Sequence, residues 1–434
     1  MELQARKRLI ARCNPREVLE EDDDRYVDID HIDEEHPPRR LAWVDEIARV
    51  FELAGTPQRL LLSGLPGSGK STELRRVAAR LERADGACLL PVLIDAEKVI
   101  DIDQPIGVPD LVLAVLAEVE AAVLKLEGQG DRPVGKENVF ERFWNFMKSE
   151  LESPEVEVKG VLLRLRSDPS LRERVRTSVS GRTTEFLERA RRELNGLEKR
   201  VCVHEVGGRA IPGQPKYAGV FVVFDSLEKL RGYSDNFKAV LDSVVWVMSR
   251  AEHLALGVHT LFTVPLAAAR RVEGVRLMPQ IKVRDPVSLE PFEPGRRALR
   301  RVIEVRLGDA ISEVLGSRAQ DRIEAMIDRS GGYTRELLEI LKLALHKDLP
   351  VSDRDFSIIF AERANEYERK IPREAIGMLK EIKKSKRPFV VKSEQPALEE
   401  LLLTYSLVMV YQNDDEWTDI NPAIARLLDQ WQDP

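Results

Sequence analysis

The sequence predicts an α/β fold in which helices cover both faces of a parallel sheet. Three apolar runs, at 60–62, 87–94 and 218–225, have the unbroken hydrophobic character of strands buried on both faces. They alternate with stretches long enough for helices of ten or more residues, which is the pattern of a parallel sheet with helical connections. Further along, residues 294 to about 385 follow a helical pattern, and two short strands near the C-terminus frame a turn.

The first part of the core is predicted from apolar spacing. A helix is expected over 43–53, then the strand 60–62, then a helix with an apolar stripe made of Leu74, Val77, Ala78 and Leu81. The second strand is expected over 87–94, and the apolar positions of 109–124 predict another helix.

A long helical insertion is predicted over about 128–213. Its apolar positions from Phe186 onward recur as Phe186, Ala190, Leu194 and Leu197, one face of a helix. Residues 157–200 carry 12 Lys and Arg against 7 Asp and Glu, a local charge of +5. This surplus is typical of a solvated helical hairpin, and the alternative is a contact surface for a partner or nucleic acid.

The remaining strands and a helical bundle follow the insertion. Strands are predicted over 218–225, which ends in the carboxylate of Asp225, over 256–264, and over 280–283. The helices that follow are expected at 294–306, 310–314, 320–328 and 334–346. Two helices at 373–384 and 398–404, a hairpin of strands 407–411 and 416–420 around 413–415, and a helix from Asn421 to Leu428 then predict a winged-helix module.

Composition narrows the class of protein. A chain of 434 residues with 43% hydrophobic residues has room for two or three domains. No signal peptide and no run of roughly 18 uncharged apolar residues is evident, so we expect a cytoplasmic protein that does not span a membrane. The three separated cysteines, Cys13, Cys88 and Cys202, are typical of reduced thiols, and six scattered histidines show no zinc spacing.

A complete phosphate-binding loop lies between the first strand and its helix. Its residues are Gly64, Leu65, Pro66, Gly67, Ser68, Gly69, Lys70 and Ser71, followed by Thr72. The glycines let backbone N–H groups approach a triphosphate, and the helix N-terminus favours the same anion. Lys70 is expected to reach the β- and γ-phosphates and Ser71 to ligate Mg²⁺. The strand–loop–helix context favours ATP with Mg²⁺ over a glycine turn that binds nothing.

Hydrolysis requires carboxylates near this loop. Asp225, at the tip of a buried strand, is placed to hold Mg²⁺ through its water shell. In many such ATPases a glutamate directly follows, but this position is Ser226, so Glu228 is the candidate that orients the attacking water. Glu228 can orient this water if the strand that ends at Asp225 bends into a helical turn. The alternative is that Glu228 is a solvated glutamate, in which case turnover is slow and the protein acts as a nucleotide switch.

The order of these motifs resembles that of the AAA+ ATPases, particularly their origin-recognition and STAND-like branches. The resemblance covers about residues 40–434 and rests on the phosphate loop, the Asp225 strand, the strand ending at Thr263, and Ser330-Gly331-Gly332-Tyr333-Thr334-Arg335-Glu336-Leu337. It implies a three-layer αβα P-loop NTPase core, an all-α lid and a C-terminal winged helix. Residues 69–74, Gly-Lys-Ser-Thr-Glu-Leu, are also similar to bacterial ATPases of conflict systems, which implies antiviral defence.

The resemblance assigns three further roles. Thr263 corresponds to the polar residue that touches the γ-phosphate or its water, and Arg335 to the lid arginine that reaches back to the γ-phosphate. The alternatives are an ordinary strand threonine and a surface arginine paired with Glu339. An arginine from a neighbouring subunit is also implied, and this would make the protein an oligomer; the candidates are Arg231, Arg250, Arg270 and Arg271.

Nucleic acid is a possible partner that the charge balance does not support. The net charge is −7, and residues 372–434 carry 8 Lys and Arg against 11 Asp and Glu. The basic cluster 383–387 is either a phosphate contact or a solvated helix end. In STAND-like proteins the winged helix is instead a latch on the ATPase core, to which the apolar residues 401–403 are suited.

The sequence therefore predicts an ATPase that uses nucleotide state to drive assembly with itself or a partner protein, or a conformational switch. The expected parts are a leader over 1–40, a core over 41–290, a lid over 291–370 and a winged-helix module over 371–434. The main rival is a nucleotide-dependent DNA-binding protein of the origin-recognition type. A small-molecule kinase fits poorly, because the lid and C-terminal module are large.

Overall fold

The computed structural model describes residues 1–128, 139–148, 161–202, 205–206, 209–210, 217–230, 236–386, 395–412 and 415–431. The chain forms two compact units. One contains residues 47–63 and 74–276, and the other contains residues 1–46, 64–73 and 277–434. The phosphate loop therefore groups with the lid and the C-terminal module, although the loop leaves the sheet of the first unit.

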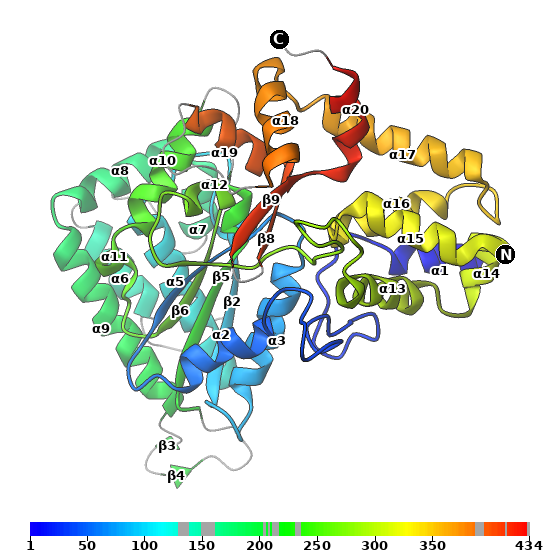
Figure 1. The fold of residues 1–434 in the computed structure, drawn as a ribbon. Helices are drawn as coiled ribbons and strands as arrows, with labels where there is room; N and C mark the ends of the chain where they lie inside the picture. The colour runs from blue at the N-terminus through cyan, green and yellow to red at the C-terminus, as the bar shows by residue number, and fades with distance from the viewer. Residues whose placement is uncertain are drawn as a thin grey trace. The chain divides into compact units, whose positions relative to one another are not determined.

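A five-stranded sheet forms the centre of the first unit (Figure 1). Its strands, in spatial order, are β2 (Leu89–Asp95), β5 (Gly219–Asp225), β6 (His259–Val264), β1 (Arg59–Ser63) and β7 (Val275–Leu277). The pairs β2–β5, β5–β6 and β6–β1 are parallel. Parallel pairing places the carboxyl ends of β1, β5 and β6 at one edge, where ligands bind in open α/β sheets.

Helices cover both faces of this sheet. On one face, Phe51 of α2 (Trp43–Glu52) packs on Phe221 of β5, with ring centroids 4.6 Å apart. On the other face, α5 (Val108–Leu126) and α9 (Thr183–Cys202) pack against the alternate residues of β5, including Val220 and Val222. Successive strand residues point to opposite faces, so both sets are buried and the predicted three-layer α/β core is confirmed.

The insertion is helical, as predicted. Its described helices are α6 (Val139–Lys148), α7 (Val161–Ser167), α8 (Pro169–Ser180) and α9, followed by the short strands β3 (Glu205–Val206) and β4 (Arg209–Ala210). The predicted apolar face from Phe186 to Leu197 is buried on α9. The other helices of this unit are α4 (Ala96–Val99), α10 (Phe237–Met248), α11 (Ala251–Leu254), α12 (Leu266–Ala269) and the turn η1 (Leu227–Lys229).

The second unit contains the predicted all-α lid (Figure 1). Its helices are α13 (Glu293–Leu307), α14 (Ile311–Leu315), α15 (Ala319–Ser330), α16 (Thr334–Ala344) and α17 (Asp353–Glu368), with the short turns η2 (Gly308–Ala310) and η3 (Gly316–Arg318). Their buried apolar residues form one core, in which Leu337 and Leu341 of α16 are fully buried.

The C-terminal module has the order expected of a winged helix. It consists of η4 (Arg373–Ala375), α18 (Ile376–Ser385), α19 (Pro396–Thr404), the antiparallel hairpin β8 (Val408–Gln412) and β9 (Glu416–Ile420), η5 (Pro422–Ile424) and α20 (Ala425–Gln430). Residues 413 and 414 of the predicted turn lie outside the described part. The turn η5 packs against α15 and α17, so the module is attached to the lid.

One local prediction is wrong. The predicted strand 280–283 is irregular, because its backbone N–H groups bond outside the sheet: Gln280 N donates to Val410 O and Lys282 N to Pro38 O. The sheet receives β7 instead. Helix α1 (Leu3–Arg12) was not predicted.

The leader over 1–40 contains buried residues. Cys13, Asp30 and Arg39 are all at most 3% exposed.

Among the described residues no helix is long and apolar enough to cross a membrane, and no group of three or more His, Cys, Asp or Glu residues is arranged to hold a metal ion. The four-part division of the chain stays a prediction.

Candidate nucleotide site

The phosphate loop has a backbone that only glycine adopts readily. Gly67 and Gly69 have φ angles of +86° and +97°, in the left-handed region that side chains disfavour. A Cβ on Gly64 would lie 2.7 Å from Met278 O, so this position also excludes a side chain. Glycine is therefore favoured at Gly67 and Gly69 by the left-handed backbone and at Gly64 by the close approach of Met278 O, while the approach of the loop N–H groups to a triphosphate stays a prediction.

Lys70 lies inside the loop. It begins α3 (Lys70–Glu82) and is 2% exposed, and its Nζ donates to Gly64 O at 3.0 Å and to Leu65 O at 2.9 Å. These bonds place a positive charge at the centre of the loop, at the N-terminus of a helix. Both features favour an anion at this place.

Two lid residues contact the same loop. A Cβ on Gly67 would lie only 2.2 Å from Nε of Arg335, so the guanidinium rests on the Gly67 backbone. The Tyr333 hydroxyl donates to Pro66 O. Among the described residues Arg335 makes no ion pair with Glu339, and the alternative of a surface salt bridge is therefore not observed.

Unsatisfied donors test whether the loop suits a triphosphate. Ser68 Oγ and Arg335 Nε are buried atoms that, within the described residues, have no hydrogen-bond partner. Such atoms cost free energy unless a ligand or water satisfies them. With Lys70, they supply two cations and a hydroxyl at one glycine loop, a donor set that fits phosphate oxygens. The residues present therefore fit the predicted ATP.

The lid segment that carries Arg335 is held from two sides. Glu336 accepts two bonds from Arg363, at 2.8 and 2.7 Å, and one from Tyr367 Oη at 2.9 Å. On the other side, Tyr411 Oη of the C-terminal hairpin donates to Gly331 O at 2.5 Å. The position of Arg335 is thus determined by both the lid and the C-terminal module.

Asp225 and Glu228 lie at the carboxyl edge of the sheet. Asp225 ends β5 in register with Asp95 of β2. Ser226 adopts a left-handed φ of +67° and starts η1, which contains Glu228. The strand therefore bends into a helical turn, as the assignment of Glu228 requires, and Glu228 is 8% exposed rather than solvated.

Thr263 supports that turn. Its Oγ1 accepts from Leu227 N at 2.9 Å and donates to Phe224 O at 3.4 Å. The single hydroxyl proton is therefore engaged with the β5 strand, and this geometry favours positioning of Glu228 over direct donation to a phosphate.

The predicted residues thus occur in both units. The loop residues Gly64 to Thr72 and Arg335 are in one unit, where the loop and Arg335 are in contact; Asp225, Glu228 and Thr263 lie together in the other. The chain links them, because β1 pairs with β6 up to Ser63 and Val264 and the loop starts at the next residue. Ser71 is half-buried, and the hydroxyl of Thr72 accepts from Leu19 N at 3.2 Å.

Sequence reasoning missed the residues behind the loop. Glu73 accepts from Arg39 at 2.9 Å and from Tyr26 Oη at 3.1 Å, and Arg39 also makes a bidentate pair with Asp30 at 2.8 and 2.7 Å. Burial raises the pKa of Glu73, and the charge of Arg39 opposes this effect. Tyr333 was also missed, although it lies in the quoted lid motif.

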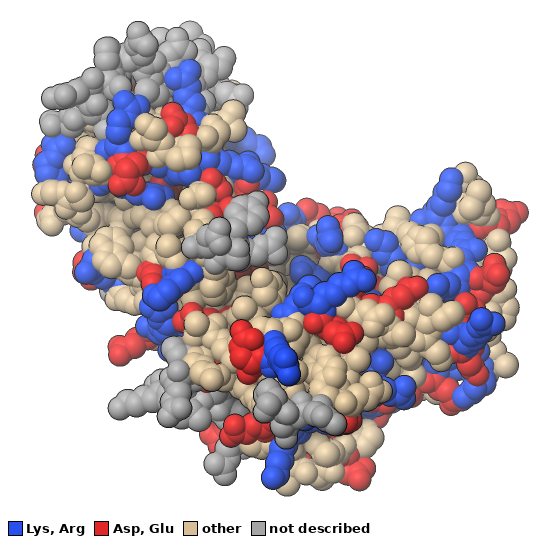
Figure 2. All heavy atoms as spheres, turned by 90° about the horizontal axis from the view of Figure 1, so that it is seen from above, with Lys and Arg blue, Asp and Glu red and all other residues tan. Residues whose placement is uncertain are grey.

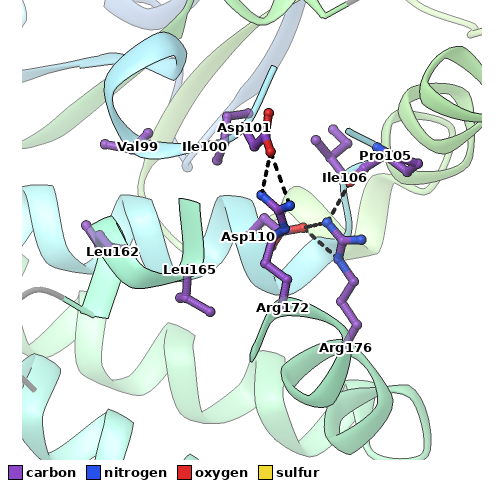
Figure 3. Close-up of a pocket in the computed structure, with 10 residues that line it drawn as sticks. All are labelled: Val99, Ile100, Asp101, Pro105, Ile106, Asp110, Leu162, Leu165, Arg172 and Arg176. Carbon is purple, nitrogen blue, oxygen red and sulfur yellow. Dashed lines mark hydrogen bonds and ion pairs between the residues drawn. The ribbon is translucent and has the colours of Figure 1, made fainter. Parts of the chain in front are cut away.

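The basic insertion uses many of its arginines internally. A small pocket there is lined partly by Asp101, Asp110, Arg172 and Arg176 (Figure 3). Figure 3 shows both guanidiniums turned inward: Arg172 pairs with Asp101 at 3.2 Å and Arg176 with Asp110 at 2.7 Å. Paired side chains of this kind favour a structural role over a contact surface.

Comparison with known protein families and with characterised proteins finds no match to this sequence. Among solved structures, the chain is similar to the Orc1 protein of Aeropyrum pernix in complex with DNA, at 14% identity and a TM-score of 0.35 over 90% of this chain and 91% of that one. It is also similar to Cdc6p of Pyrobaculum aerophilum, at 11% identity and a TM-score of 0.35 over 97% and 98%. At these values neither match assigns an activity to this chain.

Proposed function

We propose that the chain binds ATP with Mg²⁺ at the loop 64–72 and hydrolyses it, using the nucleotide state to set the position of the lid. The observation that supports this most strongly is the convergence on one glycine loop of buried Lys70, the unsatisfied hydroxyl of Ser68 and the guanidinium of Arg335. Three donors of this kind at a helix N-terminus suit a polyphosphate better than a neutral ligand.

Each residue has a role in this proposal. Lys70 and the loop N–H groups hold the phosphates, and Ser71 with Asp225 would hold Mg²⁺, which neutralises charge on the phosphates. Glu228 orients the attacking water. Thr263 fixes the turn that carries Glu228, through its bond to Leu227 N.

Arg335 makes the lid responsive to nucleotide. A lid arginine that contacts a phosphate loses that partner when the phosphate leaves, so the lid has two preferred states. Rigid support from Glu336 and Tyr411 would transmit the change to the lid and C-terminal module. This behaviour is that of an AAA+-type switch.

Assembly into an oligomer is part of the proposal, but the proposal does not choose which arginine a neighbouring subunit would contribute. Of the candidates, Arg271 pairs with Asp242 at 2.7 Å, Arg250 stacks on Trp246 at 4.4 Å, and Arg231 lies outside the described residues. Arg270 also has an interaction partner within the chain, so the choice among the four candidates stays open. The defence role rests on the resemblance alone, and we do not propose it.

DNA binding of the origin-recognition type is the second candidate function, and the charges argue against it. Lys383 and Lys386 of the basic cluster pair with Asp429 and Asp419 within the C-terminal module. Figure 2 shows acidic and basic side chains interspersed on the face in view. DNA-stimulated turnover with a steep salt dependence would favour this candidate nonetheless.

Substitution of Lys70 tests the proposed function. Lys70→Ala should abolish measurable ATP binding in isothermal titration while the circular dichroism spectrum stays unchanged, because the loop cation is not part of an apolar core. Lys342→Ala, on the lid helix α16, is a matched control that should bind ATP normally. ATP binding by Lys70→Ala equal to that of the unmodified protein would refute the nucleotide site.

A further inference from the structure

The residues 17–40 contact the first turn of α3 through three hydrogen bonds that the proposed chemistry does not use. Leu19 N donates to Thr72 Oγ1, Tyr26 Oη to Glu73, and Arg39 Nη2 to Glu73. Thr72 and Glu73 directly follow Ser71. Residues 17–40 therefore hold the first turn of α3, directly after the phosphate loop.

The strongest of these contacts is a buried cluster of three charges. Asp30, Arg39 and Glu73 are each 3% exposed. Arg39 donates Nε and Nη2 to the two oxygens of Asp30, and the same Nη2 also donates to Glu73. Asp30 in turn accepts from Trp43 N at 3.1 Å, at the start of α2.

Such a cluster is weak evidence for stability. Desolvation of buried charges offsets much of their attraction, and apolar residues of similar volume often stabilise a fold equally well. Its value lies in geometry, because a planar guanidinium bonded to two carboxylates fixes both of them. One of the two, Glu73, is in the first turn of α3, where Lys70, Ser71 and Thr72 precede it.

We propose that Arg39 and Glu73 are positioning residues for the nucleotide: their ion pair holds the first turn of α3 so that Lys70, Ser71 and Thr72 are arranged for phosphates before ATP arrives. This inference rests on the proposed function. It predicts a reciprocal effect, because coupling between two binding events acts equally in both directions. ATP should therefore strengthen the docking of residues 17–40.

Glu73→Ala is the variant of choice, because it leaves Arg39 paired with Asp30 and strands no buried charge. We expect ATP affinity to fall about tenfold, the scale of losing a charge-assisted hydrogen bond. The KM for ATP should rise similarly with kcat little changed, because ground state and transition state both use the positioned loop. Glu73→Gln keeps the shape and an acceptor oxygen and should recover part of the affinity.

Two measurements separate positioning from general stability. Arg80→Ala removes the ion pair of α3 with Glu52, at 2.7 Å and distant in sequence from the loop, and should leave ATP affinity unchanged even if the melting temperature falls. Hydrogen exchange of residues 17–40 should slow on ATP addition to the unmodified protein and should not respond in Glu73→Ala.

The outcomes are distinguishable. If the unmodified protein does not bind ATP, the proposed function fails. If it binds ATP but Glu73→Ala and Glu73→Gln bind it equally well, the positioning inference is overturned while the proposed function stands. An equal loss of affinity in Arg80→Ala would also overturn it, because the effect would then belong to helix stability.

Discussion

Replacement of Arg335 by alanine separates a nucleotide-sensing lid from a lid that only packs on the loop. The guanidinium rests on Gly67, and its Nε has no hydrogen-bond partner among the described residues. No carboxylate of the described residues pairs with Arg335, so its removal leaves no buried charge unpaired. We expect the free energy of unfolding to change by less than about 1 kcal/mol, the range of substitutions that leave no cavity or unpaired group. For a chain of this size that is a melting-temperature shift of about 3 °C or less.

Turnover should respond far more strongly. If Arg335 stabilises charge on the γ-phosphate in the transition state, its loss should lower kcat by about 10² to 10³, the usual scale for one preorganised donor. ATP should still bind through Lys70 and Ser71, which the substitution leaves intact. The protease sensitivity of the lid should then differ less between the ATP and ADP forms.

The measurements are steady-state ATPase rates, ATP titration, thermal unfolding and limited proteolysis with each nucleotide. Arg301→Ala is the matched control, since Arg301 is an exposed lid arginine that pairs with Glu304 at 3.3 Å on the same helix. It should behave like the unmodified protein in all four. A normal rate and a normal ATP–ADP difference in Arg335→Ala would refute the sensing role.

Three further substitutions test other parts of the reasoning. Glu228→Gln should keep ATP bound and lower turnover by about 10² or more, and unchanged turnover would place the water-orienting role elsewhere. Gly332→Ala should destabilise the lid by about 3 kcal/mol or more in a denaturation assay, because the φ of Gly332 is +88° and a Cβ would lie 1.7 Å from Ile281 O. Gly377→Ala is the control and should be neutral in the same assay, because a Cβ there would have nothing within 4 Å. The hydrogen bond with Asp28 raises the pKa of His31 above 6.5, so this contact stabilises fully below pH 6.5 and is lost as pH rises through the raised pKa. His31→Gln should accordingly lower the melting temperature at pH 5.5 but not at pH 9, and an equal loss at both would exclude protonation as the cause.

Local patterns predicted most of the elements, because the sheet and bundle follow the periodicity of buried side chains. The strand 218–225 and the stripe from Leu74 to Leu81 were recognisable since every residue in them that had to be buried is apolar. The strand predicted at 280–283 failed for a different reason. Its apolar character is real, with Ile281 and Val283 each 2% exposed, but its N–H groups bond to Val410 and Pro38, partners far away in the chain.

The site shows the same limit. The phosphate loop was recognisable because phosphate chemistry restricts residue type and spacing over a short stretch. The role of Arg335 came from the resemblance to AAA+ ATPases, and it stays a prediction, as does that of Asp225. The hydrogen bond from Leu227 N to the Thr263 hydroxyl was not recognisable from the sequence. It depends on the hydroxyl proton of Thr263 being donated to Phe224 O on the neighbouring strand.

The buried charges behind the loop show that a segment rich in charged residues can still be buried. Residues 1–40 were predicted as a leader and are rich in charge, yet charge is incompatible with burial only when it is unpaired. Arg39 finds its partners 9 and 34 positions away, at Asp30 and Glu73. One signal was present on α3 itself: Glu73 precedes Val77 and Leu81 by four and eight positions and therefore shares their buried face. A carboxylate on the core side of a helix requires a cation from elsewhere in the chain, and a polar leader that contains arginine was the place to look for it.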